Sequence, residues 1–492
     1  MEGSTFFAWI NRMPLIKRWG LMYSVRPENI SEHSFQVAVI ANHLVAIKNN
    51  VFGGKLDPNR AVTYALYHEV SETKLLDTPT PVKYSDPEFT EAIKKLEHKT
   101  EVQCIETLPD QLQSSFRGFV VQKEADPEYK KIVKAADVIA AYIKCLTELK
   151  FHNVEFVHVK ENLEKTLSPM VGSMPEVKEF LSIFVAPSLA NLNLSNMGIT
   201  PKGPTNRDPL DRSLKTAIIE RMFQNRPEIK EFLNIFIAPS VDSLDLSNME
   251  IDQATSRPDT LGQNHKAAVS HMLDSRPEVK AFLETFLDDL SDLALNTTNQ
   301  AKKKVSLEQS HKVAVIAHIL GVLNKKVFSG DIDPEKAAGC ALHHECAKSI
   351  TLSSSNPDTT AVHLALGQAI SANMLVGLAD SQQIEKIPSY LKDSLLESFS
   401  GNGTEKKYQD IVEAAETIAR YIESLNKIRF QNNGSTGSKE KLEKILAPMK
   451  DKMPEVKLFL STFVPSCTAT IDQITRKAQP PIQEEDQEIS LR

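Results

Sequence analysis

One short stretch of the chain gathers side chains that could bind a metal ion. His68, Glu69 and Glu72 lie close together, shortly after the sequence Asp57-Pro58. An Asp N-cap followed by Pro favours a helix start, and apolar residues then recur at helical spacing, so we predict one amphipathic helix over 58–74. His68 and Glu72 would share a face of this helix. One imidazole and two carboxylates on one turn could supply half of a divalent-metal site, although a capped, solvated helix end is the commoner reason for such residues.

Two further helices each carry one polar residue that interrupts an apolar pattern. His33 opens a helix predicted over 31–50, and Asp137 lies within an apolar helix predicted over 126–149. A histidine in such a place is usually a packed core residue. A carboxylate is costly to bury without a cation or several hydrogen-bond donors. One shared metal would account for all of these residues together. Its ligands would be His33, His68, Glu69 and Asp137.

The order of His, His-acid and Asp on three helices resembles the HD-domain metal-dependent phosphohydrolases. Within that superfamily, residues 1–195 resemble the bacterial 5'-deoxynucleotidases. The matching segments are collinear: Phe6-Phe7-Ala8, Lys17-Arg18-Trp19, Ser31-Glu32-His33-Ser34, Tyr67-His68-Glu69, Asp77–Tyr84, Lys134-Ala135-Ala136-Asp137 and Ile183–Ser188. The chain departs from the family at one ligand position, because Glu69 stands where the family has Asp.

The resemblance implies an all-α fold and a metal-dependent phosphomonoesterase that acts on deoxyribonucleoside 5'-monophosphates. The four ligands would hold one divalent cation, which could be Co, Mn, Zn or Fe. Arg18 would bind the phosphate, Trp19 would pack near the sugar, and Glu72 would orient the attacking water or move its proton. The remaining substrate contacts implied by the family are His33, Asp77, Thr78, Pro79 and Thr80.

Two other functions stay open from the sequence. The Glu69 departure and the decay of a second, repeated half favour a non-catalytic nucleotide-binding or scaffolding protein in which both HD sites are degenerate. Another HD reaction, the hydrolysis of a cyclic or polyphosphorylated nucleotide, is a weaker option. The Arg18-Trp19 dipeptide and the segment 77–84 argue against it.

The composition is that of an ordinary globular chain. Of its 492 residues, 41% are hydrophobic and 25% charged, and the net charge is −7. An acidic balance without a basic stripe argues against a nucleic-acid partner. The five cysteines are scattered and odd in number, as in a reduced cytosolic protein. Because no apolar run could span a membrane and the N-terminus lacks signal-peptide features, we expect a cytoplasmic protein.

The chain repeats one short motif four times. A Pro-Glu-(Val/Ile)-Lys sequence begins at Pro175 and returns at Pro227, Pro277 and Pro454. The two middle copies lie in a spacer over 200–300, which could be a helical linker or a short solenoid.

A larger repeat divides the chain into two halves. Residues 307–348 repeat residues 31–72 at a fixed offset of 276 positions. Gln309 replaces His33 and Lys348 replaces Glu72, so we interpret the second half as a pseudoenzyme. The sequence therefore predicts two tandem HD-like helical domains at 1–199 and 301–470, with a disordered tail at 471–492. Because the family resembled here forms homodimers, we expect the halves to pack as an intramolecular pseudo-dimer.

Overall fold

The structure is a computed structural model of the whole chain. It describes residues 3–151, 153–185, 307–351, 406–431 and 436–468. The chain divides into two compact units, one formed by Met1–Gly203 with Lys304–Arg492 and the other by Pro204–Lys303. Every described residue belongs to the first unit. The expected repeats of the 200–300 spacer and the tail from 471 lie outside the described residues.

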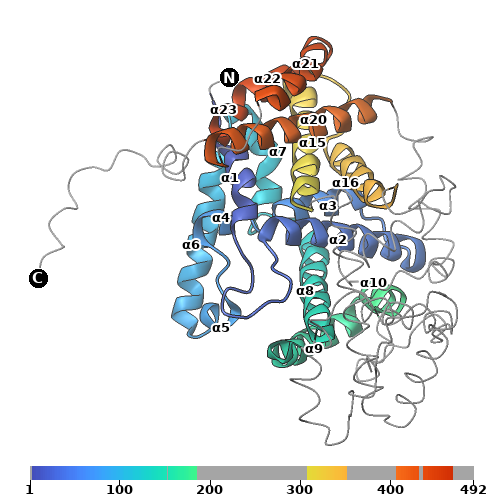
Figure 1. Cartoon of the computed structure of the whole chain (residues 1–492). Coiled ribbons are helices and arrows are strands. Elements are labelled where there is room, and N and C mark those ends of the chain that lie inside the picture. Colours follow the sequence, from blue (N-terminus) through green and yellow to red (C-terminus); the bar gives the residue numbers. More distant parts are fainter. Residues whose placement is uncertain (1–2, 152, 186–306, 352–405, 432–435, 469–492) are drawn as a thin grey trace, which may run out of the picture. The chain divides into compact units, whose positions relative to one another are not determined.

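The described part of the chain is all-α, as predicted (Figure 1). The first half contains α1 (Phe6–Arg12), η1 (Met13–Leu15), α2 (Ile30–Phe52), α3 (Pro58–Tyr67), α4 (Glu72–Leu75), α5 (Thr80–Lys83), α6 (Pro87–Glu106), α7 (Asp110–Val120), α8 (Pro127–Lys150), η2 (Val154–Phe156), α9 (Val157–Ser173), α10 (Pro175–Phe180) and the π-helical turn η3 (Leu181–Val185). The second half contains α15 (Leu307–Val327), α16 (Pro334–Thr351), α20 (Lys406–Asn426), the π-helical turn η8 (Lys427–Gln431), α21 (Thr436–Lys452), α22 (Pro454–Thr462) and α23 (Val464–Cys467). No helix among the described residues is long and apolar enough to cross a membrane.

Capping residues set the ends of the helices that carry the predicted ligands. The Asn29 side chain accepts hydrogen bonds from the backbone N–H groups of Ser31 and Glu32, and Glu32 bonds back to the N–H of Asn29. This capping box starts α2 at Ile30. His33 lies three residues further along, at the end of the first helical turn. Asp126 caps α8 by accepting from the N–H of Glu128, with Pro at the first helical position. Local sequence therefore fixes where α2 and α8 begin.

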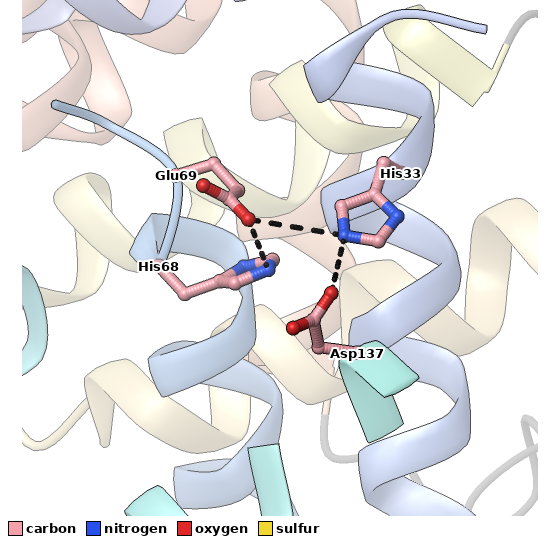
Figure 2. A group of neighbouring side chains, drawn as sticks. All are labelled: His33, His68, Glu69 and Asp137. Atoms are coloured by element: carbon pink, nitrogen blue, oxygen red, sulfur yellow. Dashed lines mark hydrogen bonds and ion pairs between the residues drawn. The ribbon is translucent and has the colours of Figure 1, made fainter. Parts of the chain in front are cut away.

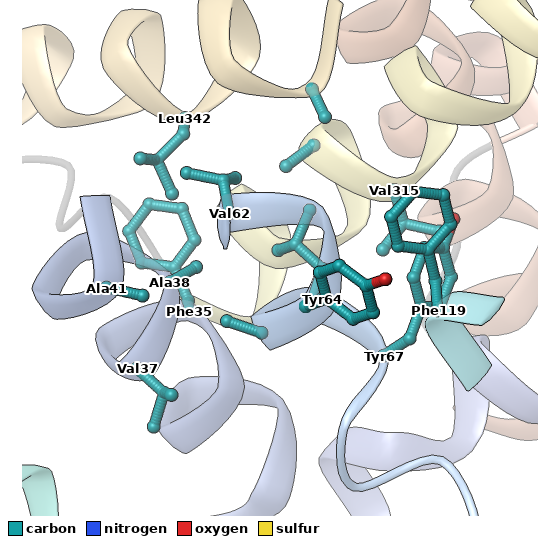
Figure 3. Packing of buried hydrophobic residues seen from close by; sticks show 14 of the residues in the cluster. Phe35, Val37, Ala38, Ala41, Val62, Tyr64, Tyr67, Phe119, Val315 and Leu342 are labelled. Atoms are coloured by element: carbon teal, nitrogen blue, oxygen red, sulfur yellow. The ribbon is translucent and has the colours of Figure 1, made fainter. Parts of the chain in front are cut away.

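The two halves share one apolar core. Helix α2 packs against α3, α8 and α10, while α15 packs on α2 and α16 packs on α3. Leu342 and Val315 of the second half belong to the same buried cluster as Phe35, Val62 and Tyr64 of the first (Figure 3). Because each large apolar side chain contributes about 1.5–3 kcal/mol when fully buried, this shared core is a major source of stability for both halves.

The helix predicted over 58–74 is interrupted, and that prediction is wrong. Helix α3 ends at Tyr67, the residues 68–71 form a turn, and α4 begins at Glu72. His68 and Glu72 therefore do not share one helical face. The equivalent stretch of the second half continues without a break as α16. A hydrogen bond from His311 of the second half reaches Leu66 O at this break.

The first helix of the chain is short. Helix α1 ends at Arg12, and Pro14 lies in the 3-10 turn that follows. Proline disrupts an α-helix because it lacks the N–H and its ring clashes with the preceding turn. At Ile16 the backbone is extended, with φ −93° and ψ 112°. The chain thus reaches Arg18 and Trp19 in a connection rather than on a helix.

Candidate metal centre

Four predicted ligands converge at one place in the first half (Figure 2). His33 comes from α2, His68 and Glu69 from the turn after α3, and Asp137 from α8. One ligand atom of each lies within 4.8 Å of all the others. His33 Nε2 lies 3.1 Å from Asp137 Oδ1 and 3.9 Å from Glu69 Oε1. His68 Nε2 lies 3.3 Å from Glu69 Oε1.

The hydrogen bonding of His68 suits it to bind a metal. Its Nδ1 donates to the carbonyl oxygen of Ala65 at 2.7 Å, since a carbonyl can only accept. The other ring nitrogen, Nε2, is buried and makes no hydrogen bond to any described residue, so it can bind a metal through its lone pair. Two imidazole nitrogens and two carboxylates are a donor set that first-row divalent cations accept. The residues present therefore fit a divalent metal.

The two carboxylates of the centre are held in their charged form. Burial alone would raise the pKa of Glu69, but the contact with His68 and the positive charge of Arg18 keep it below its usual value. Burial would likewise raise the pKa of Asp137, yet His33 and Lys134 lower it. Lys134 Nζ donates to Asp137 Oδ2 at 2.7 Å. Both groups thus offer negative oxygens to a cation.

Glu72 and Asp77 lie beside the four predicted ligands, and their pKa values are shifted in the opposite direction from those of Glu69 and Asp137. Burial, together with the charges of Glu69 and Asp77, raises the pKa of Glu72 well above its usual value. The pKa of Asp77 is raised by burial, with a further contribution from Glu69. Glu72 Oε2 is buried and has no hydrogen-bond partner among the described residues. Glu72 can therefore hold a proton next to the ligands, from α4.

Arg18 faces the centre from the connection between η1 and α2. Its Nη1 lies 3.8 Å from Glu69 Oε1, and its Nε lies 3.8 Å from Glu28 Oε2. Trp19 follows with a φ of 63°, a left-handed conformation that is uncommon for residues other than glycine. Its indole N–H donates to Glu28 Oε2 at 2.8 Å, and its ring packs 5.4 Å from that of Phe156. The structure thus places Arg18 at the centre and Trp19 next to it.

A buried carboxylate of α8 holds the rest of this connection. Glu148 accepts from the backbone N–H groups of Val25 and Arg26 at 2.8 and 3.0 Å and from Ser24 Oγ at 2.9 Å. Lys144 pairs with the same carboxylate. Hydrogen bonds to an ionised, buried group are strong, so this network fixes the path of the chain from Trp19 back to α2.

Glu28 is a residue of the centre that the sequence analysis missed. Its Oε1 lies 3.5 Å from His33 Nδ1, and its carboxylate also contacts Arg18 and Trp19. Burial would raise its pKa, but the contact with His33 and the charge of Arg18 lower it to about 2. A histidine that binds a metal through one ring nitrogen usually donates a hydrogen bond from the other to a group such as this carboxylate. Nothing in the local sequence distinguishes this loop glutamate from a surface one.

The predicted substrate loop lies between α4 and α5. Thr78 and Pro79 are half-buried, and Thr80, the first residue of α5, is exposed. Leu76 precedes Asp77 with φ 67° and ψ 163°, a region used almost only by glycine. A strain of about 1–3 kcal/mol is typical for such a residue. Of the loop side chains, Asp77 is the one whose charge acts on Arg18.

The second half contains a smaller cluster of the same kind. One ligand atom each of His344, Glu345 and Glu416 lies within 4.8 Å of the other two. His344 is 45% exposed, and its Nε2 lies 3.8 Å from Glu416 Oε2. Ser310 Oγ donates to Glu345 Oε2 at 3.0 Å. The side chain of Lys348, which replaces Glu72 here, lies outside the described residues.

Comparisons with known proteins agree with the motifs. A family model described as 5'-deoxynucleotidase YfbR-like matches residues 5–188 and 295–467. A 5'-deoxynucleotidase of Vibrio cholerae is 46% identical over 188 residues, which are 38% of this chain and 95% of that protein. One of Yersinia pestis is 44% identical over 182 residues, 37% of this chain and 91% of that protein. A solved HD-domain phosphohydrolase of Listeria innocua aligns with 39% of this chain and 91% of its own, at 23% identity and a TM-score of 0.35.

The family model matches both halves, which together form most of the chain. The resemblance read from the motifs of the first half is therefore confirmed, and it extends to the second half. This protein belongs to the YfbR-like family of 5'-deoxynucleotidases.

Proposed function

We propose that the first half is a divalent-metal-dependent phosphomonoesterase that hydrolyses deoxyribonucleoside 5'-monophosphates to deoxyribonucleosides and phosphate. The observation that carries this proposal is the convergence of His33, His68, Glu69 and Asp137 beside the guanidinium of Arg18. The names of the relatives from Vibrio and Yersinia support the same reaction.

The side chains around the centre suit the parts of this reaction. A bound divalent cation supplies Lewis-acid activation of water and of the phosphate ester. Arg18, beside Glu69, is placed to bind phosphate oxygens with its planar donors. Glu72, with its raised pKa, is placed to hold and transfer a proton. Trp19 offers a flat wall for the sugar, and Asp77 to Thr80 would contact the nucleoside.

The identity of the metal is part of the proposal. Two histidines and two carboxylates suit Co, Mn, Zn or Fe.

The location of the protein is also part of the proposal. Buried, unpaired cysteines such as Cys104 and Cys145 support a reducing, cytoplasmic location.

We also propose that the second half is a pseudoenzyme which packs on the first as a pseudo-dimer. Helix α15 meets α2, its counterpart in the repeat, and α16 meets its counterpart α3. Two copies related by a two-fold axis bring equivalent elements together in this way. The proposed boundaries are 1–199 and 301–470 for the two domains.

The proposal is tested by phosphate release from the purified full chain. The substrates are deoxyribonucleoside and ribonucleoside 5'-monophosphates, a 3'-monophosphate and a cyclic nucleotide, each assayed with Co²⁺, Mn²⁺, Zn²⁺ and Fe²⁺. We expect release from the deoxyribonucleoside 5'-monophosphates and its loss in His33→Ala. His158→Ala, a change at a 90% exposed histidine of α9, serves as the matched control. Nucleotide binding without phosphate release under every metal would favour the non-catalytic alternative.

A further inference from the structure

The break after α3 leaves two carbonyl groups without their usual helical partners. In a continuous helix the N–H of Val70 would donate to Leu66, but here it donates to Tyr67 O at 3.2 Å. The last carbonyls of any helix need other donors. His68 satisfies one of them through its own Nδ1, which donates to Ala65 O.

The second carbonyl is satisfied by the other half of the chain. His311 of α15 is buried, and its Nε2 donates to Leu66 O at 2.9 Å. Burial lowers the pKa of His311 to about 4, so the ring is neutral at physiological pH. Its Nδ1 must then accept, and the hydroxyl of Ser31 donates to it at 3.2 Å. One imidazole thus links the end of α3 to the first turn of α2.

Both partners of His311 lie two positions before a metal ligand. Leu66 precedes His68, and Ser31 precedes His33. Other side chains of α15 reinforce the contact. Glu308 Oε1 accepts from Asn29 Nδ2 at 2.6 Å, and His318 Nδ1 lies 2.9 Å from Tyr67 Oη. The second half therefore contacts the segments that present two ligands of the first-half centre.

The internal repeat provides a built-in comparison. At the offset of 276 positions, His311 corresponds to Phe35 and Leu66 to Leu342. A phenyl ring has no N–H to give to a carbonyl. Helix α16 runs through Leu342 without a break, whereas α3 ends one residue after Leu66. The break thus occurs in the half whose helix end receives a histidine from the other half.

We propose that His311 is a positioning residue of the first-half metal centre. By capping Leu66 O and holding Ser31, it keeps the turn that directs His68 and Glu69 toward His33. The inference rests on the proposed function in one respect, namely that this centre binds a divalent cation. Through His311, the second half would support the metal centre of the first half without taking part in the reaction itself.

The experiment compares four variants of the full chain with the wild type. His311→Phe installs the residue of the first half and removes both hydrogen bonds. His311→Gln keeps an N–H that can reach Leu66 O. Ser31→Ala removes the hydrogen bond between the Ser31 hydroxyl and His311 Nδ1 by a change in the first half. It keeps the inference testable if His311→Phe does not fold. Lys326→Ala, an exposed position on the same helix, is the control.

Three quantities are measured: the Kd for Mn²⁺, the kcat and KM for a deoxyribonucleoside 5'-monophosphate, and the melting temperature. We expect His311→Phe to raise the Mn²⁺ Kd about tenfold or more, as loss of groups that orient metal ligands generally does. Its kcat should fall while KM stays near the wild-type value. His311→Gln should recover most of the Mn²⁺ affinity, and Ser31→Ala should raise the Kd by a smaller factor.

The outcomes separate this inference from the proposed function. An unchanged Mn²⁺ Kd in both His311→Phe and Ser31→Ala, with only the melting temperature lowered, would show a merely structural role and overturn the inference. If the wild type binds Mn²⁺ but releases no phosphate, the proposed function fails and the Kd series still decides the inference. A wild type that binds no divalent metal overturns both.

Discussion

The carboxylate of Glu28 accepts the indole N–H of Trp19 at 2.8 Å. The same carboxylate lies 3.5 Å from Nδ1 of His33, a proposed metal ligand. One buried carboxylate therefore contacts both the imidazole of a proposed metal ligand and the indole proposed to pack against the sugar. Its pKa is lowered to about 2 by His33 and Arg18, so the carboxylate is ionised at neutral pH.

We predict that Glu28→Gln weakens metal binding. The amide oxygen can still accept from Trp19, but the negative charge facing His33 is lost, so the imidazole is a poorer ligand. The Kd for Mn²⁺, measured by calorimetry, should rise about tenfold. Glu106→Gln, an exposed change at the end of α6, is the control and should leave the Kd unaltered. Equal Kd values for the two variants would show that Glu28 does not orient the ligand.

Glu69→Asp is expected to keep or raise the turnover number. The change restores the family's residue, and a shorter side chain from the same turn can still bring an oxygen to about 2.0–2.2 Å from a metal. Steady-state phosphate release measures the effect. A loss of bound metal in this variant would mean that the turn after α3 has adapted to the longer glutamate.

Glu72→Ala is expected to abolish turnover while leaving the metal bound. The residue lies on α4 and is not among the four converging ligands, and its raised pKa suits proton transfer. Loss of a general acid or base lowers the rate about 100-fold or more. Metal content by elemental analysis and kcat are measured on the same sample. Metal loss would place Glu72 in the ligand set and contradict its proposed role.

Glu101→Gln is expected to stabilise the protein at and above neutral pH. Burial raises the pKa of Glu101 to about 7, above the value of about 4.3 for an unfolded chain. The folded state therefore binds this proton more tightly, and its contribution to stability is complete below about pH 4.5 and is lost as the pH rises to about 7. A glutamine carries no titratable proton, so the stability of the variant does not fall over this pH range. Its amide oxygen can still accept from the N–H of Gln122, which in the wild type lies 3.1 Å from the carboxylate.

The measurement for this prediction is the melting temperature of both proteins between pH 5 and pH 8. The gain at pH 8 should correspond to about 2–3 kcal/mol and should shrink toward pH 5. A gain of the same size at both ends would show that the pKa of Glu101 is not raised.

The parts of the fold that depend on local sequence could be predicted. Asp57, Asp86 and Asp126 each precede a proline, and each caps a helix that the structure contains. The four proposed ligands, whose side chains the structure brings together, could be named because each interrupts an apolar helix or follows a family motif. Here the physical cause lies within a few residues of its effect.

The rest depends on contacts between distant parts of the chain. The break after Tyr67 coincides with a hydrogen bond from His311, and the apolar pattern of 58–74 continues through it unchanged. Glu28 matters because the connection around it is held on α8 by Glu148. Neither effect has a signal in the residues next to it. Helix periodicity alone therefore predicts the continuous helix of the second half and misses the interrupted one of the first.

The most direct test of the account compares metal content and phosphate release in Asp137→Ala and His344→Ala, made in the full chain. The account predicts about one bound divalent cation and active turnover in the wild type, neither in Asp137→Ala, and both unchanged in His344→Ala. Turnover that survives Asp137→Ala but is lost in His344→Ala would place the chemistry in the second half and contradict the central claim.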